Sequence, residues 1–172
     1  MKYKFTLPFI LFFLLLAAFL VKLSLKSGDD LFSKTQMIGI AVPDFSIPAL
    51  SGGRLKSHDL QGKTTLVNFF ASWCEACRYE QTALVMLAKK TGVAIYGITW
   101  KDDDAKTSAW LKKFGNPYKK IGTDHEGKAA ITFGITGVPE TFLIGTNGTV
   151  LFRQPGPIDQ KAYDDLLKML KK

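Results

Sequence analysis

The chain has 172 residues, of which 47% are hydrophobic and 22% charged, and its formal net charge is +8. This length leaves room for one domain of roughly 130–150 residues behind a targeting segment, which is large enough to bury a full core without staples. The positive charges form no basic stripe interleaved with aromatic residues, and four of the lysines fall within residues 1–26, where there is no acid. The composition therefore argues against nucleic-acid binding.

An uncharged, largely apolar run extends from Phe5 to Val21, between Lys4 and Lys22. The core of a cleaved signal peptide is shorter, about 7–15 residues, whereas a spanning helix needs about 17 or more. A cleaved signal peptide and an uncleaved anchor both fit the run, but no small-x-small cleavage motif stands at its end. We therefore interpret residues 1–26 as a signal-anchor that exports the domain behind it.

Residues 27–40 are weakly patterned and are expected to form a linker, and the folded domain is predicted to span residues 41–172. This domain opens with a proline-containing extended segment at residues 42–50. A short helical turn is expected next, ending at Gly62.

The rest of the domain alternates between strand and helix patterns. Continuous apolar runs at residues 64–71 and 93–100 predict two buried strands. Further segments are assigned by pattern and by their end signals, in chain order: a helix from the cysteine motif to Thr91, a helix at 103–114, a short helix within 125–134, strands at 138–145 and 150–154, and a last helix behind Asp159. The turn between the last two strands contains Asn147 and Gly148, which are expected to supply positive φ angles. This order predicts an α/β fold with a mixed sheet and helices on both faces.

The only two cysteines, Cys74 and Cys77, form a C-x-x-C pair. A closed zinc site needs four ligands, and neither His58 nor His125 lies at a finger-like spacing from the pair. Haem attachment requires a histidine directly after the second cysteine, but that residue is Arg78. A purely structural disulfide across so short a loop would restrict the unfolded chain very little.

A redox-active dithiol explains the placement of the pair best. A strand leads into the motif and a helix leads out of it, so Cys74 lies at a helix N-terminus, where free N–H groups and the helix dipole stabilise a thiolate. Cys77 follows one turn later. We expect Cys74 to attack a substrate disulfide and Cys77 to resolve the mixed disulfide, with Trp73 shielding one side.

Two passages then point to a family. The stretch LVNFFASWCEAC resembles the passage from strand to active site in thioredoxin-like proteins, and GVPETFLIG is similar to the segment in which that fold places a cis-proline. With YGITWKDDDAKTSAWLKKFGNPY, they resemble the CcmG/DsbE family, the membrane-anchored thiol reductases of cytochrome c maturation. The resemblance covers roughly residue 35 to the C-terminus. It implies a thioredoxin-like fold with N-terminal extension strands and a family-type insert.

The resemblance also implies roles for individual residues. Cys74 matches the family's nucleophile and Cys77 its resolving thiol. Pro139 matches the cis-proline, and the backbone of Val138 beside it would pair with an extended substrate segment.

Glu80 and Glu140 match acids that line the family's active site, where a carboxylate raises the thiol pKa or relays protons. Two positions depart from the common thioredoxin pattern. Asn68 stands where thioredoxins carry a buried aspartate, so another group or water is expected to transfer protons in its place, with Glu80 and Glu140 as the candidate groups. Glu75 lies between the cysteines, and its negative charge opposes the effect of the helix dipole on Cys74.

The resemblance implies a thiol:disulfide oxidoreductase, anchored in the inner membrane with its domain in the periplasm. Its expected substrate is the C-x-x-C-H pair of apocytochrome c or a carrier thiol joined to it. The reaction needs no cofactor or metal, and the electrons would come from a transmembrane thiol reductase of the DsbD or CcdA type. Two alternatives stay open: an anchored reductase for another client, such as a copper-site assembly protein, and a non-catalytic apocytochrome-binding chaperone.

Overall fold

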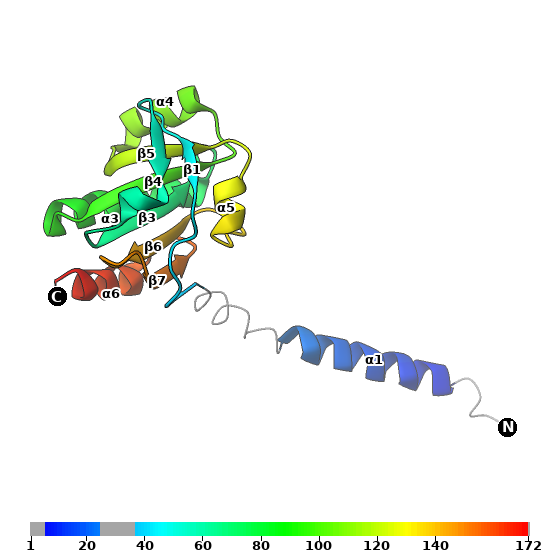
Figure 1. Ribbon diagram of the computed structural model, residues 1–172. Coiled ribbons are helices and arrows are strands. Elements are labelled where there is room, and N and C mark those ends of the chain that lie inside the picture. Colours follow the sequence, from blue (N-terminus) through cyan, green and yellow to red (C-terminus); the bar gives the residue numbers. More distant parts are fainter. Residues whose placement is uncertain (1–5, 25–36, 172) are drawn as a thin grey trace. The chain divides into compact units, whose positions relative to one another are not determined.

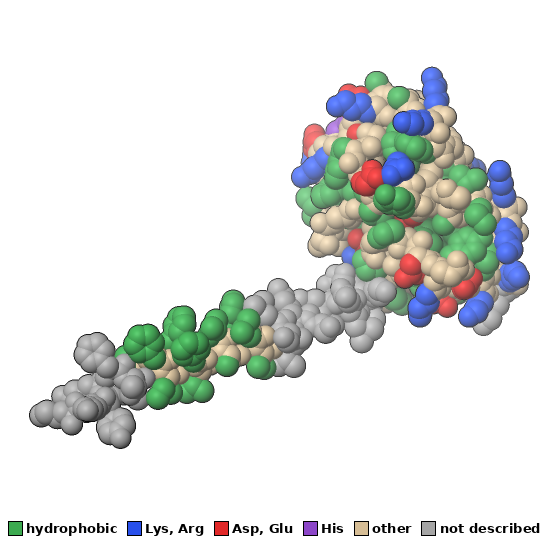
Figure 2. All heavy atoms as spheres, turned by 180° about the vertical axis from the view of Figure 1, so that it is seen from behind, with side chains coloured by type: hydrophobic (Ala, Val, Ile, Leu, Met, Phe, Trp, Pro, Cys, Tyr) green, Lys and Arg blue, Asp and Glu red, His purple; other side chains and the backbone are tan. Residues whose placement is uncertain are grey.

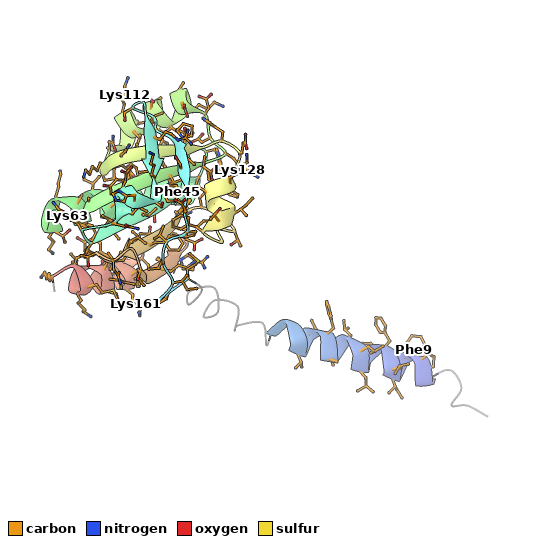
Figure 3. The ribbon with its side chains drawn as sticks, in the orientation of Figure 1. Phe9, Phe45, Lys63, Lys112, Lys128 and Lys161 are labelled. Atoms are coloured by element: carbon orange, nitrogen blue, oxygen red, sulfur yellow. A yellow bond between two sulfur atoms is a disulfide. The ribbon has the colours of Figure 1, made fainter. Side chains whose placement is uncertain are left out.

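The computed structural model describes residues 6–24 and 37–171. The chain divides into two compact units, residues 1–34 and residues 35–172. In the first unit, helix α1 (Thr6–Ser24) exposes apolar side chains, among them Phe9 and Phe13 (Figures 2 and 3). Within the described ranges, none of the helices combines the length and the hydropathy that a membrane crossing requires.

The linker expected at residues 27–40 lies outside the described residues up to residue 36, as do the lysines that precede α1. From residue 37 onward the chain is joined to the folded domain. The backbone N–H of Gly39 donates to the carbonyl of Val150, and that of Val42 donates to the carbonyl of Gly148, both at 2.8 Å. These bonds attach the start of the domain to the turn and strand at its far end.

A five-stranded sheet in the order β5-β4-β3-β6-β7 forms the centre of the domain (Figure 1). Its strands are β3 (Thr65–Phe70), β4 (Ala94–Trp100), β5 (Tyr118–Asp124), β6 (Glu140–Ile144) and β7 (Val150–Pro155). Strands β3, β4 and β5 run parallel, whereas β6 runs antiparallel to both β3 and β7. All residues of β3 are buried because this strand is covered on both faces.

Each face of the sheet has its own core. The helices are α3 (Glu75–Thr91), α4 (Asp104–Phe114), α5 (Lys128–Thr132) and α6 (Gln160–Leu170). Leu84 of α3, Trp110 of α4 and Leu166 of α6 share one buried cluster with Phe70 of β3. Three helices therefore cover the face of the sheet to which Phe70 points.

The opposite face is covered by an N-terminal hairpin and by α5. The hairpin consists of β1 (Ser46–Pro48) and β2 (Arg54–Lys56), followed by the 3-10 helix η2 (Ser57–Leu60). Phe45, labelled in Figure 3, packs edge-on against Phe133, with ring centroids 5.6 Å apart. Both lie in a second buried cluster with Phe69, the neighbour of Phe70 on β3. The alternation along β3 thus separates the two cores.

This architecture confirms the predicted thioredoxin-like α/β fold, with a mixed sheet flanked by helices and an N-terminal pair of extension strands. Strand β5 was not expected. Its sequence, YKKIGTD, carries two adjacent lysines and a glycine, so it lacks the continuous apolar run of β3. Because β5 lies at the edge of the sheet, its lysines reach solvent.

The turn between β6 and β7 also differs from expectation in one detail. Gly148 has a positive φ angle of 81°, but Asn147 does not share that conformation. Instead, the Asn147 side-chain oxygen accepts a hydrogen bond from the Thr149 backbone N–H at 3.1 Å. Asn147 therefore stabilises the turn through its side chain and not through a positive φ angle.

Candidate active site

The cysteine pair lies at the junction between β3 and α3. Cys74 is the N-cap of α3, and its Sγ accepts a hydrogen bond from the Cys77 backbone N–H at 3.0 Å. The two cysteines form a disulfide, with their Cα atoms 5.3 Å apart. Cys74 is 7% exposed and Cys77 only 1%, so an incoming thiol or disulfide reaches Cys74 first.

The charge at the start of α3 is more balanced than the sequence alone indicated. Glu75 forms an exposed ion pair with Arg78, and the hydrogen bond from Arg78 lowers the pKa of Glu75. Glu75 is therefore ionised, but the positive charge of Arg78 stands beside it. Because the ion pair offsets the negative charge of Glu75, the helix dipole and the free N–H groups at the start of α3 can stabilise a Cys74 thiolate.

The segment before β6 lies directly against the disulfide. The peptide bond between Val138 and Pro139 is cis, and the Val138 carbonyl oxygen lies 3.5 Å from Cys74 Sγ. Residues 64 positions apart in the sequence thus meet because β6 pairs with β3. The structure brings the cis Val138–Pro139 peptide beside Cys74, as the sequence predicted.

Behind the cysteines lies a buried polar network centred on Glu80, which is 2% exposed. Glu80 accepts hydrogen bonds from the Asn68 side chain at 2.8 Å and from the Ile158 backbone N–H at 3.1 Å. Asn68 also donates to the Thr141 hydroxyl at 3.0 Å and accepts from the Tyr118 hydroxyl at 2.7 Å. The amide that replaces the aspartate of thioredoxins is therefore fully engaged, and it holds Glu80 in place.

Glu80 has the properties of a proton carrier at neutral pH. Burial raises its pKa to about 7, although the hydrogen bonds from Asn68 and Ile158 oppose that rise. It follows Cys77 by one turn of α3, and both side chains are buried. A carboxyl group with this pKa gains and loses a proton near physiological pH, which is the requirement for a general acid or base.

Glu140 has different surroundings. Its buried carboxylate forms an ion pair with the equally buried Arg153 of β7. Arg153 also donates to the Gly134 carbonyl at 3.0 Å, so it links both ends of the loop that carries Pro139. Burial raises the pKa of Glu140, and the guanidinium opposes that rise. The sequence does not single out Arg153, because an arginine on a strand is ordinarily exposed and its burial here depends on the pairing of β7 with β6.

Trp73 provides an exposed aromatic surface beside the nucleophile. It is 58% exposed, and its indole N–H donates to the Lys101 carbonyl at 3.3 Å. The indole also contacts Trp100, with ring centroids 6.1 Å apart. A hollow that Cys74 itself lines is bounded by aromatic side chains and by polar and charged ones: Ser72, Trp73, Glu75, Arg78, Trp110, Lys113 and Phe114. The surface beside Cys74 is therefore partly aromatic and carries charges of both signs.

Comparison with known proteins agrees with this site. The sequence model of the Redoxin family matches residues 37–169. The thiol:disulfide interchange protein DsbE of Pseudomonas fluorescens biotype C is 41% identical over 156 residues, covering 90% of this chain and 86% of the relative. DsbE of Escherichia coli K12 is 36% identical over 169 residues, covering 95% of this chain and 91% of the relative.

Solved structures show the same fold. A thiol-disulfide oxidoreductase from Bacteroides fragilis superposes with a TM-score of 0.65 at 26% identity, over 76% of this chain and 98% of the other. The predicted family and the predicted thiol:disulfide oxidoreductase chemistry of Cys74 and Cys77 are thereby confirmed. The chain belongs to the DsbE family of thiol:disulfide interchange proteins.

Proposed function

We propose that this protein is a reductant in cytochrome c maturation, and that its dithiol reduces the C-x-x-C-H pair of apocytochrome c or a carrier thiol joined to it. Membership of the DsbE family supports this pathway. The observation that carries the proposal is the position of Cys74, the more exposed of the two cysteines, at a helix N-terminus with its Sγ 3.5 Å from the Val138 carbonyl. An extended peptide that pairs with the backbone of Val138 would present its disulfide to that sulfur.

The first chemical step forms a mixed disulfide. The Cys74 thiolate attacks one sulfur of the substrate disulfide, so a bond forms between Cys74 and the substrate while the substrate S–S bond breaks. The second substrate sulfur leaves as a thiolate and takes up a proton. The α3 N-terminus stabilises the attacking thiolate, which keeps Cys74 reactive at neutral pH.

The second step releases the reduced substrate. Cys77 loses its proton to Glu80, and its thiolate attacks Cys74 Sγ, which breaks the mixed disulfide. The substrate has then gained two electrons and two protons, and the protein holds the Cys74–Cys77 disulfide. A transmembrane thiol reductase of the DsbD or CcdA type would return two electrons to the pair. The exchange runs on sulfur alone and needs no cofactor.

The N-terminal segment supports the location of this chemistry. We assign residues 1–26 as the anchor in the cytoplasmic membrane, residues 27–40 as the linker and residues 41–172 as the domain on the periplasmic side. The uncharged run from Phe5 to Val21 lies between lysines, and the described part of α1 exposes apolar side chains. An oxidising compartment is where a dedicated reductant of thiols is needed.

Of the alternatives, a reductase for a different client, such as a copper-site assembly protein, uses the same chemistry and differs only in the trapped partner. A non-catalytic chaperone has no need for an accessible, disulfide-forming pair, so the geometry of Cys74 and Cys77 disfavours it.

A trapping experiment tests the proposal. The full chain carrying Cys77→Ser is expressed in its own cells, where the mixed disulfide on Cys74 cannot be resolved and accumulates. We expect apocytochrome c or a maturation carrier among the proteins released by reductant. The double variant Cys74→Ser with Cys77→Ser is the matched control and should trap nothing. Recovery of other clients without these two would contradict the proposed pathway.

A further inference from the structure

The carboxylate of Asp102 lies against the loop that carries the nucleophile. Asp102 lies two residues after the end of β4, at the same edge of the sheet where β3 ends, and is 8% exposed. It accepts a hydrogen bond from the Ser72 backbone N–H at 2.6 Å and another from the Ser72 hydroxyl at 2.7 Å. Ser72 precedes Cys74 by two residues, so these bonds fix the approach of the chain to the active sulfur.

The same carboxylate is bonded to the start of α4. It accepts hydrogen bonds from the Thr107 hydroxyl at 2.8 Å and from the Asp103 backbone N–H at 2.9 Å. Burial alone would raise the pKa of Asp102, but the bonds from Ser72, Thr107 and Asp103 outweigh it and hold the pKa below its usual range. Asp102 is therefore a permanent negative charge that joins the cysteine loop to α4.

The residue before Asp102 contacts the same loop. Lys101 has a positive φ angle of 50°, a backbone conformation that residues other than glycine seldom adopt. In this conformation its carbonyl accepts the hydrogen bond from the Trp73 indole. Two adjacent residues after β4 thus bind the two residues that directly precede Cys74. An unfavourable backbone conformation that surrounding contacts hold in place is typical of functional sites.

We propose that Asp102 is a positioning residue for thiol:disulfide exchange, which fixes Ser72 two residues before Cys74 and places a negative charge against the cysteine loop. The inference rests on the interchange chemistry alone and is independent of which substrate the protein reduces. Formation of the mixed disulfide requires Cys74 Sγ to stay beside Val138. The hydrogen bonds that Asp102 accepts from Ser72, Asp103 and Thr107, which we call the Asp102 brace, hold the cysteine loop in that position. Its negative charge also disfavours the Cys74 thiolate, which makes the dithiol a stronger reductant.

Substitution by asparagine removes the charge and keeps most of the hydrogen bonds. In Asp102→Asn the remaining side-chain oxygen can still accept from the Ser72 N–H and the Thr107 hydroxyl, and the amide can donate to the Ser72 hydroxyl, but the bond from the Asp103 N–H is lost. We expect the full-length protein in detergent to fold, with a lower Cys74 thiol pKa measured by the ultraviolet absorbance of the thiolate. In glutathione redox buffers the equilibrium should shift about three- to tenfold toward the reduced form, where tenfold corresponds to about 30 mV.

The neighbouring Asp103→Asn is the matched control. It removes the same charge one residue away but keeps the cap of α4, because an asparagine oxygen can still accept from the Lys106 N–H, which lies 2.9 Å from the Asp103 carboxylate. A purely structural role for Asp102 predicts lower stability in Asp102→Asn and an unchanged thiol pKa in both variants. If Asp102→Asn moves the thiol pKa and the glutathione equilibrium no further than Asp103→Asn, the proposal is wrong.

A second variant, Ser72→Ala, tests the same proposal if Asp102→Asn fails to fold. Ser72→Ala removes only the hydroxyl partner and keeps the backbone N–H bond. We expect mixed-disulfide formation with a small aromatic disulfide to slow about threefold, together with a change in the fluorescence of Trp73. Rates and fluorescence equal to those of the unaltered protein would overturn the role assigned to the brace.

Discussion

At the scale of single residues, Glu80 and Glu140 are both buried acids near the cysteine motif, but their surroundings give them different properties. Glu80 is bonded only to uncharged donors in its described contacts, from Asn68 and Ile158. Glu140 faces the guanidinium of Arg153. Burial raises the pKa of both acids, but only Glu140 has a cation beside it that opposes the rise. We therefore propose that Glu80 transfers protons and that Glu140 supports the Pro139 loop.

This assignment predicts a specific dependence of stability on pH. The pKa of Glu80 is about 7 in the folded protein against an ordinary value of 4.5. A raised carboxyl pKa means that the folded state binds the proton more tightly than the unfolded state. The resulting stability is complete below about pH 4.5 and is lost as pH rises through about 7, for a total of about 3 kcal/mol.

In Glu80→Gln this pH dependence should disappear. The amide offers one acceptor to two donors, which lowers stability by a similar amount at every pH. Urea unfolding of the oxidised protein at pH 5 and pH 8 checks the expectation. The difference between the original protein and the variant should be larger at pH 5, while the exposed Glu75→Gln serves as control. Equal differences at the two pH values would show that Glu80 does not titrate in this range.

At the scale of secondary structure, the sequence predicted those helices whose ends are marked by capping residues. Helix α3 ends at Gly92, which adopts the left-handed conformation, and α6 begins at Asp159, whose carboxylate accepts from the Ala162 N–H at 2.7 Å. Strand β5 has no such signal, because an edge strand tolerates lysines and its pairing with β4 is decided by tertiary contacts.

The contact between β5 and the hairpin leads to a prediction about stability. A Cβ atom added at Gly122 of β5 would lie 2.4 Å from Ile47 Cδ1 and 3.0 Å from Leu55 Cδ2. Gly122→Ala must therefore displace the side chains of Ile47 and Leu55, which loosens the packing of the hairpin at a cost of about 1–3 kcal/mol. Urea unfolding measures the cost, and amide hydrogen exchange should show faster exchange in β1 and β2.

Gly137→Ala is the matched control for that measurement. A Cβ atom at Gly137 meets no atom within 4 Å, and its φ angle lies outside the left-handed region. The alanine there should leave stability within about 0.5 kcal/mol of the original protein. If the two alanine variants unfold at the same urea concentration, close packing between the hairpin and β5 is not what holds this face together.

At the scale of the whole molecule, the active site is assembled from segments that the sequence keeps far apart. The cysteine loop follows β3, the Asp102 brace follows β4, and Val138 precedes β6. The motif, the proline and the candidate acids could be named from the sequence because each carries a recognisable local pattern. Their partners Arg153 and Asp102 could not, because a buried hydrogen bond depends on which strands become neighbours.

The whole protein is proposed to act as a reductant, and this direction of electron flow is the central claim. It requires the Cys74–Cys77 disulfide to have a more negative reduction potential than the active-site disulfide of a strong oxidant. The charge arrangement supports this, since the negative Asp102 is bonded to the cysteine loop and the helix dipole acts in the opposite sense. The balance of these two effects appears directly in the reduction potential.

The most direct test is therefore the reduction potential of the full-length protein, equilibrated with glutathione buffers and followed by its tryptophan fluorescence. A reductant should have a value between that of protein disulfide isomerase, about −180 mV, and that of thioredoxin, about −270 mV. A value near about −120 mV, that of the strong oxidant DsbA, would contradict the proposal that this protein reduces disulfides.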